Sequence, residues 1–566
     1  MFRLILIIIG LMLAGPAAAQ NVPAPTPVPT SAQWRQDLEA AADALRLRHP
    51  DPFTRIGRRE FMRRLQALEE ALPALTEEQR GVRALQLFAA VGEGHTNLDL
   101  TGAGFRSWYP IRLYEFTDGI YIVSARREQA GLAGARVIEI GGRPAREAVD
   151  LARTLIGADN DIGALENVFA ASNAGLMRGL GLTAPDGSLQ LRVRRAGQRR
   201  DETVPLQAMA GYATMEWRNR SEVFGVGFGD YADWISAYRA LPATAFRTPD
   251  PTRPPHLVYR RHFIAVPLPQ RDAYYIQVNY MLDAPDETLA DFFHRALAEV
   301  DRQRPHRLIV DLRYNSGGDG SKIPSVIHQF IAREAAPPWR ELFVLTGRKT
   351  FSAAVNLVEA FREHVPASFV GEPAGAGFRH AGNAEQLLFP GSGLQLYVST
   401  AWHGEAGPVE EVYTPVDVPA QFSSADYIAG RDPAVDAILG GVEMRALPLI
   451  AQAEGAAALR RAYDERRARF GAIGWWRAAD MLLLNAAGYH LLGAGRQADA
   501  LEAFRVNTEI YPDSWYVWDS LGEAQLAAGQ RAEGVASYRR SLALNPGNAT
   551  ARRIVEEADR AARPAS

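Results

Sequence analysis

Two segments of this 566-residue chain carry groups that could act together in nucleophilic catalysis. Ser352 comes shortly after an apolar run at 342–345 and directly before a helical pattern, so it should lie where a strand gives way to a helix. A hydroxyl in that place is usually only a helix N-cap. The sequence Asn-Ser-Gly-Gly at 315–318 follows another apolar run, and its glycines favour a turn that exposes backbone N–H groups. Beside such a turn, a serine can be a nucleophile that faces an oxyanion hole.

A histidine that could serve as the general base lies far upstream. His95 follows a helical pattern over 76–91 and is framed by Gly92 and Gly94, so we expect it in a loop rather than on an apolar face. The alternative is a polar residue near the C-terminal end of that helix. Sequence order does not decide between them, because serine, histidine and an acid can be brought together on unrelated folds.

Other catalytic signatures are missing from the sequence. It has no Gly-x-Ser-x-Gly elbow, no Ser-x-x-Lys around Ser352, no His-Glu-x-x-His metal motif and no phosphate-binding loop at 317–322. The complete absence of cysteine excludes disulfides, thiol catalysis and cysteine metal sites. We therefore expect neither a cofactor nor a metal ion.

The segments around Ser352 should form an α/β core. Apolar runs predict strands at 274–278, 308–312, 342–345, 368–371 and 394–399. Helical patterns alternate with the first of these at 287–301, 323–333 and from 353 onward. We place the catalytic core at 206–440. Residues 205–255, at its start, show no clear hydrophobic periodicity and are left unassigned.

The N-terminal part predicts a secreted protein with a helical start. Residues 1–20 read as a signal peptide, 21–33 as a proline-rich linker, and no later segment is apolar enough to cross a bilayer. Helices are expected at 34–48, 58–72 and 76–91, within an N-terminal region at 34–115 that carries His95. A hairpin at Asp118-Gly119 begins a PDZ-like segment at 116–205. The net charge of −3 argues against a nucleic-acid partner.

The C-terminal part, 450–566, is helical and contains a 34-residue repeat. Gly488, Gly495, Ala498, Phe504 and Pro512 recur as Gly522, Gly529, Ala532, Tyr538 and Pro546. This period is typical of tetratricopeptide repeats, which stack into an all-α solenoid with a concave surface for a protein partner.

Three segments together resemble the signature blocks of one serine protease family. Residues 92–96, 311–318 and 347–354 are similar to those of the tail-specific (C-terminal processing) and tricorn-core proteases, and the likeness extends over about 35–440. The resemblance implies Ser352 as nucleophile, His95 as base, and the N–H groups of Gly317 and Ala353 as oxyanion donors. Members with a lysine base carry it downstream of the serine, and no lysine follows Lys349 here.

In the histidine type, the resemblance places the third catalytic residue at Glu410, beside Glu411. Both could instead form a solvated acidic pair in a loop. His380, in a glycine-rich loop, either lines the substrate cleft or is a turn residue, and Gly318 is a further candidate for the oxyanion hole. Asp311 is expected to pair with Arg313 or to hold the turn rather than to take part in the chemistry.

The expected fold is α/β and multidomain: an α+β protease core with an N-terminal helical subdomain and a PDZ-like insert, followed by the repeat solenoid. The expected function is that of a secreted, periplasmic serine endopeptidase acting on peptides or unfolded proteins. The alternative is a catalytically inactive scaffold of the same fold that binds peptides or proteins through its PDZ-like and repeat surfaces.

Overall fold

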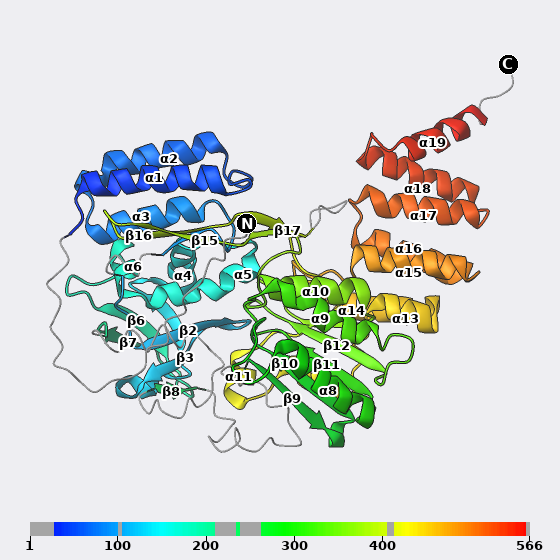
Figure 1. Cartoon of the computed structure of the whole chain (residues 1–566), viewed down its shortest axis with the longest axis horizontal. Coiled ribbons are helices and arrows are strands. Elements are labelled where there is room, and N and C mark those ends of the chain that lie inside the picture. The colour runs from blue at the N-terminus through cyan, green and yellow to red at the C-terminus, as the bar shows by residue number, and fades with distance from the viewer. Residues whose placement is uncertain (1–27, 100–104, 210–233, 238–261, 405–411, 562–566) are drawn as a thin grey trace, which may run out of the picture.

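The computed structural model describes residues 28–99, 105–209, 234–237, 262–404 and 412–561, and it has a mixed α/β architecture with several sheets (Figure 1). The limits proposed above for the signal peptide, linker and domains remain predictions. No helix in the described ranges is both long and apolar enough to span a membrane.

Three N-terminal helices, α1 (Ser31–Arg48), α2 (Arg58–Ala71) and α3 (Glu77–Ala89), confirm the predicted helical start. Helices α1 and α3 begin at capping boxes, formed by Thr30 with Gln33 and by Thr76 with Gln79, whereas Gly57 precedes α2 without a side-chain cap. These helices share a core with a small antiparallel sheet of order β1-β16-β15, formed by β1 (Asn97–Asp99), β15 (Glu385–Phe389) and β16 (Leu394–Val398).

A seven-stranded sheet follows, and its first hairpin is found one residue from the predicted turn: Thr117 and Asp118 connect the strands, and Gly119 begins the second strand. Its strands are β2 (Ile111–Phe116), β3 (Gly119–Arg126), β4 (Arg136–Ile140), β5 (Arg143–Pro144), β6 (Leu189–Arg194), β7 (Glu202–Leu206) and β8 (Trp234–Ser236). Helices α4 (Ala145–Arg153), α5 (Asp161–Glu166) and α6 (Ala174–Gly179) lie in the same segment. The PDZ-like identity of this segment remains a prediction.

A six-stranded sheet of order β18-β13-β12-β11-β10-β9 positions the candidate site. Its strands are β9 (Phe263–Leu268), β10 (Ala273–Val278), β11 (Arg307–Asp311), β12 (Glu341–Thr346), β13 (Ser368–Gly371) and β18 (Val418–Pro419). All neighbouring pairs except β9–β10 are parallel. Helices α8 (Leu289–Gln303), α9 (Ile323–Ile331) and α10 (Ala353–His364) pack on one face. The carboxyl ends of β11 and β12 are therefore neighbours, and in such sheets this edge is where ligands bind.

The second face of this sheet shares an apolar cluster with helices from the C-terminal part of the chain. These are α12 (Pro433–Leu439), α13 (Leu447–Glu454), α14 (Ala456–Phe470), α15 (Met481–Gly493), α16 (Gln497–Ile510) and α17 (Trp515–Ala527). Outside this cluster lie α11 (Ser424–Ala429), α18 (Arg531–Leu544) and α19 (Ala549–Ala561). One apolar cluster joins Ile309 and Phe343 of the sheet to Leu459, Phe504 and Leu521 of α14, α16 and α17.

The helices α15–α19 stack as successive antiparallel pairs, at the right of Figure 1. A Cβ atom at Gly488 would lie 2.7 Å from the Phe504 ring, and a Cβ atom at Gly522 would lie 2.8 Å from the Tyr538 ring. The same close contact thus recurs after 34 positions, because only glycine lets the paired helices approach each other there. The assignment of these pairs to tetratricopeptide repeats remains a prediction.

Candidate active site

Ser352 lies at the junction between β12 and α10, as the sequence predicts, but its side chain does not cap the helix. Its backbone adopts φ 53° and ψ −131°, and its hydroxyl makes no capping hydrogen bond. Such a conformation costs a non-glycine residue about 1–3 kcal/mol, and strained residues of this kind cluster at functional sites. Ser352 is half-buried at the N-terminal end of α10, and in this conformation its hydroxyl does not stabilise the helix.

The turn that carries Ser352 is pinned to the end of the neighbouring strand β11. The Thr350 hydroxyl donates to the Leu312 carbonyl at 2.8 Å, and the Phe351 amide donates to the Asn315 carbonyl at 3.0 Å. These bonds hold Ser352 beside the Asn315–Gly318 turn without using its side chain.

Gly317 forms the surface against which Ser352 lies. Its φ is 101°, and a Cβ atom there would lie 2.6 Å from the Ser352 Cβ and 3.1 Å from the Ala353 nitrogen. The Gly317 amide donates to Asn315 Oδ1 at 2.9 Å. The Ala353 amide, in the first turn of α10, has no acceptor among the described residues.

We expect Gly317→Ala to reduce turnover by about 100-fold or more, because the added methyl group would displace Ser352 and the amides beside it. The matched control is Gly320→Ala, where the nearest atom to an added Cβ is 3.9 Å away and the backbone φ is not positive. Steady-state hydrolysis of a fluorogenic peptide by both variants measures the difference. Equal activity in the two variants would contradict this geometry.

Asp311 has the structural role that the sequence analysis expected. Its carboxylate accepts from the Arg313 guanidinium at 2.6 Å, and Arg313 also donates to both oxygens of Asp432 at 2.9 and 2.7 Å. All three groups are buried. Burial lowers the pKa of Arg313, but the Asp311 and Asp432 carboxylates outweigh it and hold this pKa well above its usual value, so the guanidinium stays charged. This cluster holds the end of β11, where the Asn315–Gly318 turn begins. Asp311 is therefore a structural residue and not a candidate for the catalytic acid.

The loop that carries His95 is held on both sides. The Gly94 amide donates to Asp159 Oδ2 at 2.9 Å, and the Asn97 side chain donates to the Gly94 carbonyl at 2.7 Å. Glu93 accepts from buried His49 at 2.8 Å and from Ser399 at 2.7 Å. These contacts restrict the position of His95 before any substrate is bound.

Asp159, which accepts from the Gly94 amide of this loop, has a shifted pKa. Burial raises its pKa to about 7, against the opposing effect of the Gly94 N–H, which favours the charged form. A Cβ atom at Gly94 would lie 2.8 Å from Asp159 Oδ2 and 2.5 Å from the Phe351 ring, so this position also requires glycine. The loop therefore packs directly on the residue that precedes Ser352.

The His95 ring itself stacks on Phe351, with ring centroids 4.4 Å apart and planes 22° from parallel. Burial, and to a smaller degree neighbouring His380, lower the pKa of His95 to about 4, while the Glu93 carboxylate opposes both effects. The ring is consequently neutral at pH 7, as a general base must be. Its Nδ1 atom is buried and has no hydrogen-bond partner in the described part of the chain.

His380 lies next to His95, with ring centroids 5.8 Å apart. It belongs to the short strand β14 (His380–Gly382), which pairs with β17 (Ala401–His403), and its Nδ1 lies 3.1 Å from the carbonyls of Gly377 and Phe378. Nδ1 is therefore the protonated nitrogen, and burial lowers the pKa of the ring. No group of three or more His, Asp or Glu side chains in the described ranges is arranged to hold a metal ion.

The structure thus brings together Ser352, Gly317, Gly318, Ala353, His95 and His380, which lie far apart in the sequence. Glu410 and Glu411 fall at 405–411, outside the described residues. Sequence reasoning missed Asp159, Phe351 and the side chain of Asn315. The spacing Asn-x-Gly at 315–317 is a signal for the Asn315 bond to the Gly317 amide. Nothing local marks Asp159, which lies 65 positions from Gly94.

No family model and no curated protein matches the sequence. Among solved structures, mature CPAF is similar at 13% identity over 76% of this chain and 98% of that chain, with a TM-score of 0.47. The photosystem II D1 C-terminal processing protease is 14% identical over 70% of this chain and 96% of that chain, with a TM-score of 0.31. The tricorn protease is 14% identical over 73% of this chain and 36% of that chain, with a TM-score of 0.33.

Proposed function

We propose that this protein is a serine endopeptidase with Ser352 as its nucleophile and His95 as its general base. The observation that carries the proposal is the strained, uncapped Ser352 held against Gly317, with the half-buried, neutral His95 stacked on the adjacent Phe351. A serine that only ended a strand would need neither the strain nor a neutral histidine beside it.

In the proposed reaction, the Ser352 hydroxyl attacks the carbonyl carbon of the scissile peptide bond while His95 takes its proton. The carbonyl oxygen becomes an oxyanion. His95 then gives the proton to the leaving amine, the C–N bond breaks, and an acyl-enzyme remains. Water, deprotonated by the same histidine, hydrolyses the ester and restores Ser352.

The Ala353 and Gly317 amides are the proposed donors to the oxyanion, with Gly318 beside them. Ala353 has an unused N–H, whereas the Gly317 N–H donates to Asn315 Oδ1 before the reaction. An oxyanion is a stronger acceptor than a neutral amide oxygen, so it can attract this N–H as charge develops. Donors of this kind typically contribute about 100- to 1000-fold to turnover.

We assign the third catalytic position to Glu410, with Glu411 and His380 as the other candidates. Two described observations support an acid from this part of the chain. His95 Nδ1 is buried and has no partner among the described residues, and the Val412 carbonyl accepts from Asn160, which adjoins Asp159 in the support of the His95 loop. A carboxylate that accepted from Nδ1 would leave Nε2 to face Ser352.

The proposed substrates are peptides or unfolded proteins, and the proposed location is the periplasm, after removal of residues 1–20. The PDZ-like segment and the repeat helices are proposed to bind peptide or protein partners. The same surfaces would serve the alternative function, that of a scaffold without catalysis. This alternative predicts no reactive nucleophile at Ser352.

A fluorophosphonate probe distinguishes the two functions. We expect the intact folded protein to form a one-to-one adduct at pH 7.5, and peptide mapping by mass spectrometry to place this adduct on Ser352. Heat-denatured protein is the control and should remain unlabelled, since reactivity depends on the assembled site. A folded protein without an adduct would support the scaffold, and an adduct elsewhere would disprove the assignment of Ser352.

A further inference from the structure

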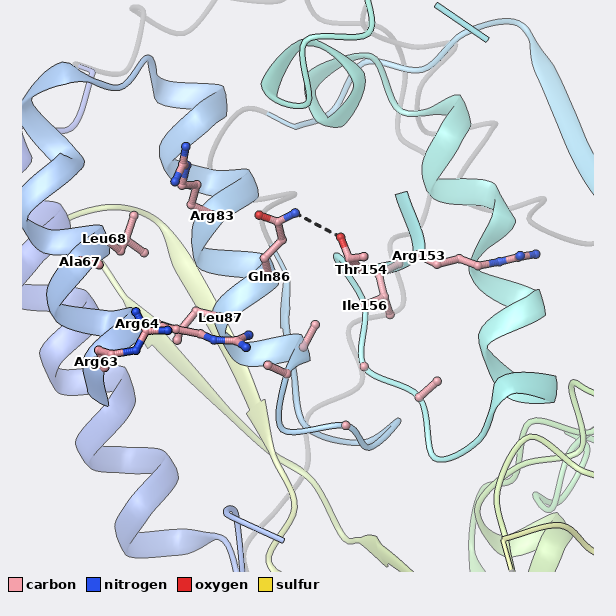
Figure 2. A pocket seen from close by; sticks show the side chains of 15 residues that line it. Arg63, Arg64, Ala67, Leu68, Arg83, Gln86, Leu87, Arg153, Thr154 and Ile156 are labelled. Carbon is pink, nitrogen blue, oxygen red and sulfur yellow. Dashed lines mark hydrogen bonds between the residues drawn. The ribbon is translucent and has the colours of Figure 1, made fainter. Parts of the chain in front are cut away.

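A second concave site lies behind the loop that carries His95. It is a cavity of about 550 Å³ between α2 and α3 on one side and the segment 153–158 on the other (Figure 2). Its volume is within the range of about 300–1,000 Å³ that small-molecule sites occupy. One wall of the cavity is formed by backbone next to this loop. Gly92 and Gly157 both line the cavity, and a Cβ atom at Gly157 would lie 2.4 Å from the Glu93 carbonyl.

The lining of this cavity has a one-sided charge. Four arginines line it, and no acidic side chain is found among its described lining residues. Arg153 extends away from α3 in Figure 2 and pairs with Glu115 and Asp150, so its charge is neutralised outside the cavity. The remaining three are Arg63, Arg64 and Arg83, which come from the two helices.

The charge of these three arginines is only partly balanced. Arg63 and Arg64 share the single carboxylate of Glu60, at 2.6 and 2.7 Å. The hydrogen bonds from the two guanidinium groups lower the pKa of Glu60 to about 2, so it stays ionised. Arg83 forms no ion pair within the part of the chain that the structure describes, and it lies one turn before Gln86 and Leu87 on the same face of α3. The cavity therefore retains an excess of positive charge.

Neutral donors complete a site for oxygen-rich anions. Gln86 donates to the Thr154 hydroxyl at 3.1 Å, and this bond links α3 to the opposite side of the cavity. Ala67, Leu68 and Ile156 supply apolar surface. Guanidinium groups bind phosphate and carboxylate through paired N–H donors, and an apolar floor favours an organic ligand over a bare ion.

From these observations we propose that the cavity binds a small polyanion that carries two or more phosphate or carboxylate groups. Arg64 and Arg83 contact the anion, and Arg63 releases part of its contact with Glu60 to join them. The site is distinct from Ser352 and His95, and binding can be measured whether or not the protein is a peptidase.

Isothermal titration calorimetry of the full chain at low ionic strength tests this site with pyrophosphate and, separately, with citrate. We expect one-to-one binding of at least one of the two. Binding of pyrophosphate alone identifies phosphate as the preferred group, and binding of citrate alone identifies carboxylate. Absence of binding of both anions would overturn the proposal.

Two variants locate the bound anion. The double variant Arg64→Gln, Arg83→Gln should bind at least about 100-fold more weakly, because it removes two charge-assisted contacts to the anion. Ala67→Phe should block the cavity by filling it. The matched control Arg59→Gln removes an exposed arginine of α2 that does not line the cavity and should bind like wild type. Unchanged binding in the double variant and in Ala67→Phe, with wild-type melting temperatures, would place the anion elsewhere and overturn the site.

Discussion

Replacement of Ser352 by alanine is expected to abolish fluorophosphonate labelling and to lower peptide hydrolysis by about 10⁶-fold, the loss typical of removing a catalytic serine. The physical reason is that no other described hydroxyl combines this strained backbone with a position beside Gly317 and Ala353. Alanine at this position keeps the packing of α10 and removes only the hydroxyl. Labelling with a fluorescent probe and hydrolysis of casein measure the two effects.

The matched control for this variant is Ser325→Ala. Ser325 lies on neighbouring α9 and its hydroxyl donates to the Lys322 carbonyl at 2.7 Å, so its removal changes one helical contact and leaves the site intact. Wild-type activity is expected there. A Ser352→Ala protein that still hydrolyses casein at the wild-type rate would remove Ser352 from the mechanism.

Replacement of His95 by alanine is expected to lower hydrolysis by at least about 10⁴-fold and to abolish labelling at neutral pH, because Ser352 then has no base. The pH dependence has a defined sign. Since burial lowers the pKa of His95 to about 4, the ring stays neutral as the pH falls to 5, where an ordinary histidine would be protonated. Wild-type labelling at pH 5 should therefore remain close to that at pH 7 and decline only near pH 4.

His364→Ala is the matched control for His95. His364 ends α10 and is exposed, so its loss should change neither labelling nor its pH profile. A decline in wild-type labelling centred near pH 6.5 would show that the environment of His95 during the reaction differs from the buried one described above. Labelling that persists in His95→Ala would assign the base to another residue.

The sequence predicted the elements around the site because their signals are local. The strand at 368–371 and the helix from Ala353 are found where apolar spacing placed them, and the helix at 76–91 is found, slightly shorter, as α3. The sequence placed Gly317 in a turn after a strand and Gly94 in a loop after a helix, because glycine favours such connections. The proposed pairing of Asp311 with Arg313 is confirmed.

The remaining features depend on contacts between distant segments, which no local pattern encodes. The stacking of His95 on Phe351 joins residues 256 positions apart, and the Asp159 carboxylate accepts from the Gly94 amide 65 positions before it. The conformation of Ser352 could not be predicted either. A serine before a helix is ordinarily an N-cap, and only the packing of Gly317 and Thr350 around it excludes that role.

The apolar cluster that joins the six-stranded sheet to α14, α16 and α17 has a consequence for how the chain tolerates change. Ile309 and Phe343, on the strands that lead to the Asn315 turn and to Ser352, belong to the same buried apolar cluster as residues of α12 to α17. The sheet that carries Ser352 and these C-terminal helices therefore share one continuous core, and loss of the helices would expose part of that core to water. By thermodynamic linkage, a partner that binds only the folded helices also stabilises the strands beneath Ser352.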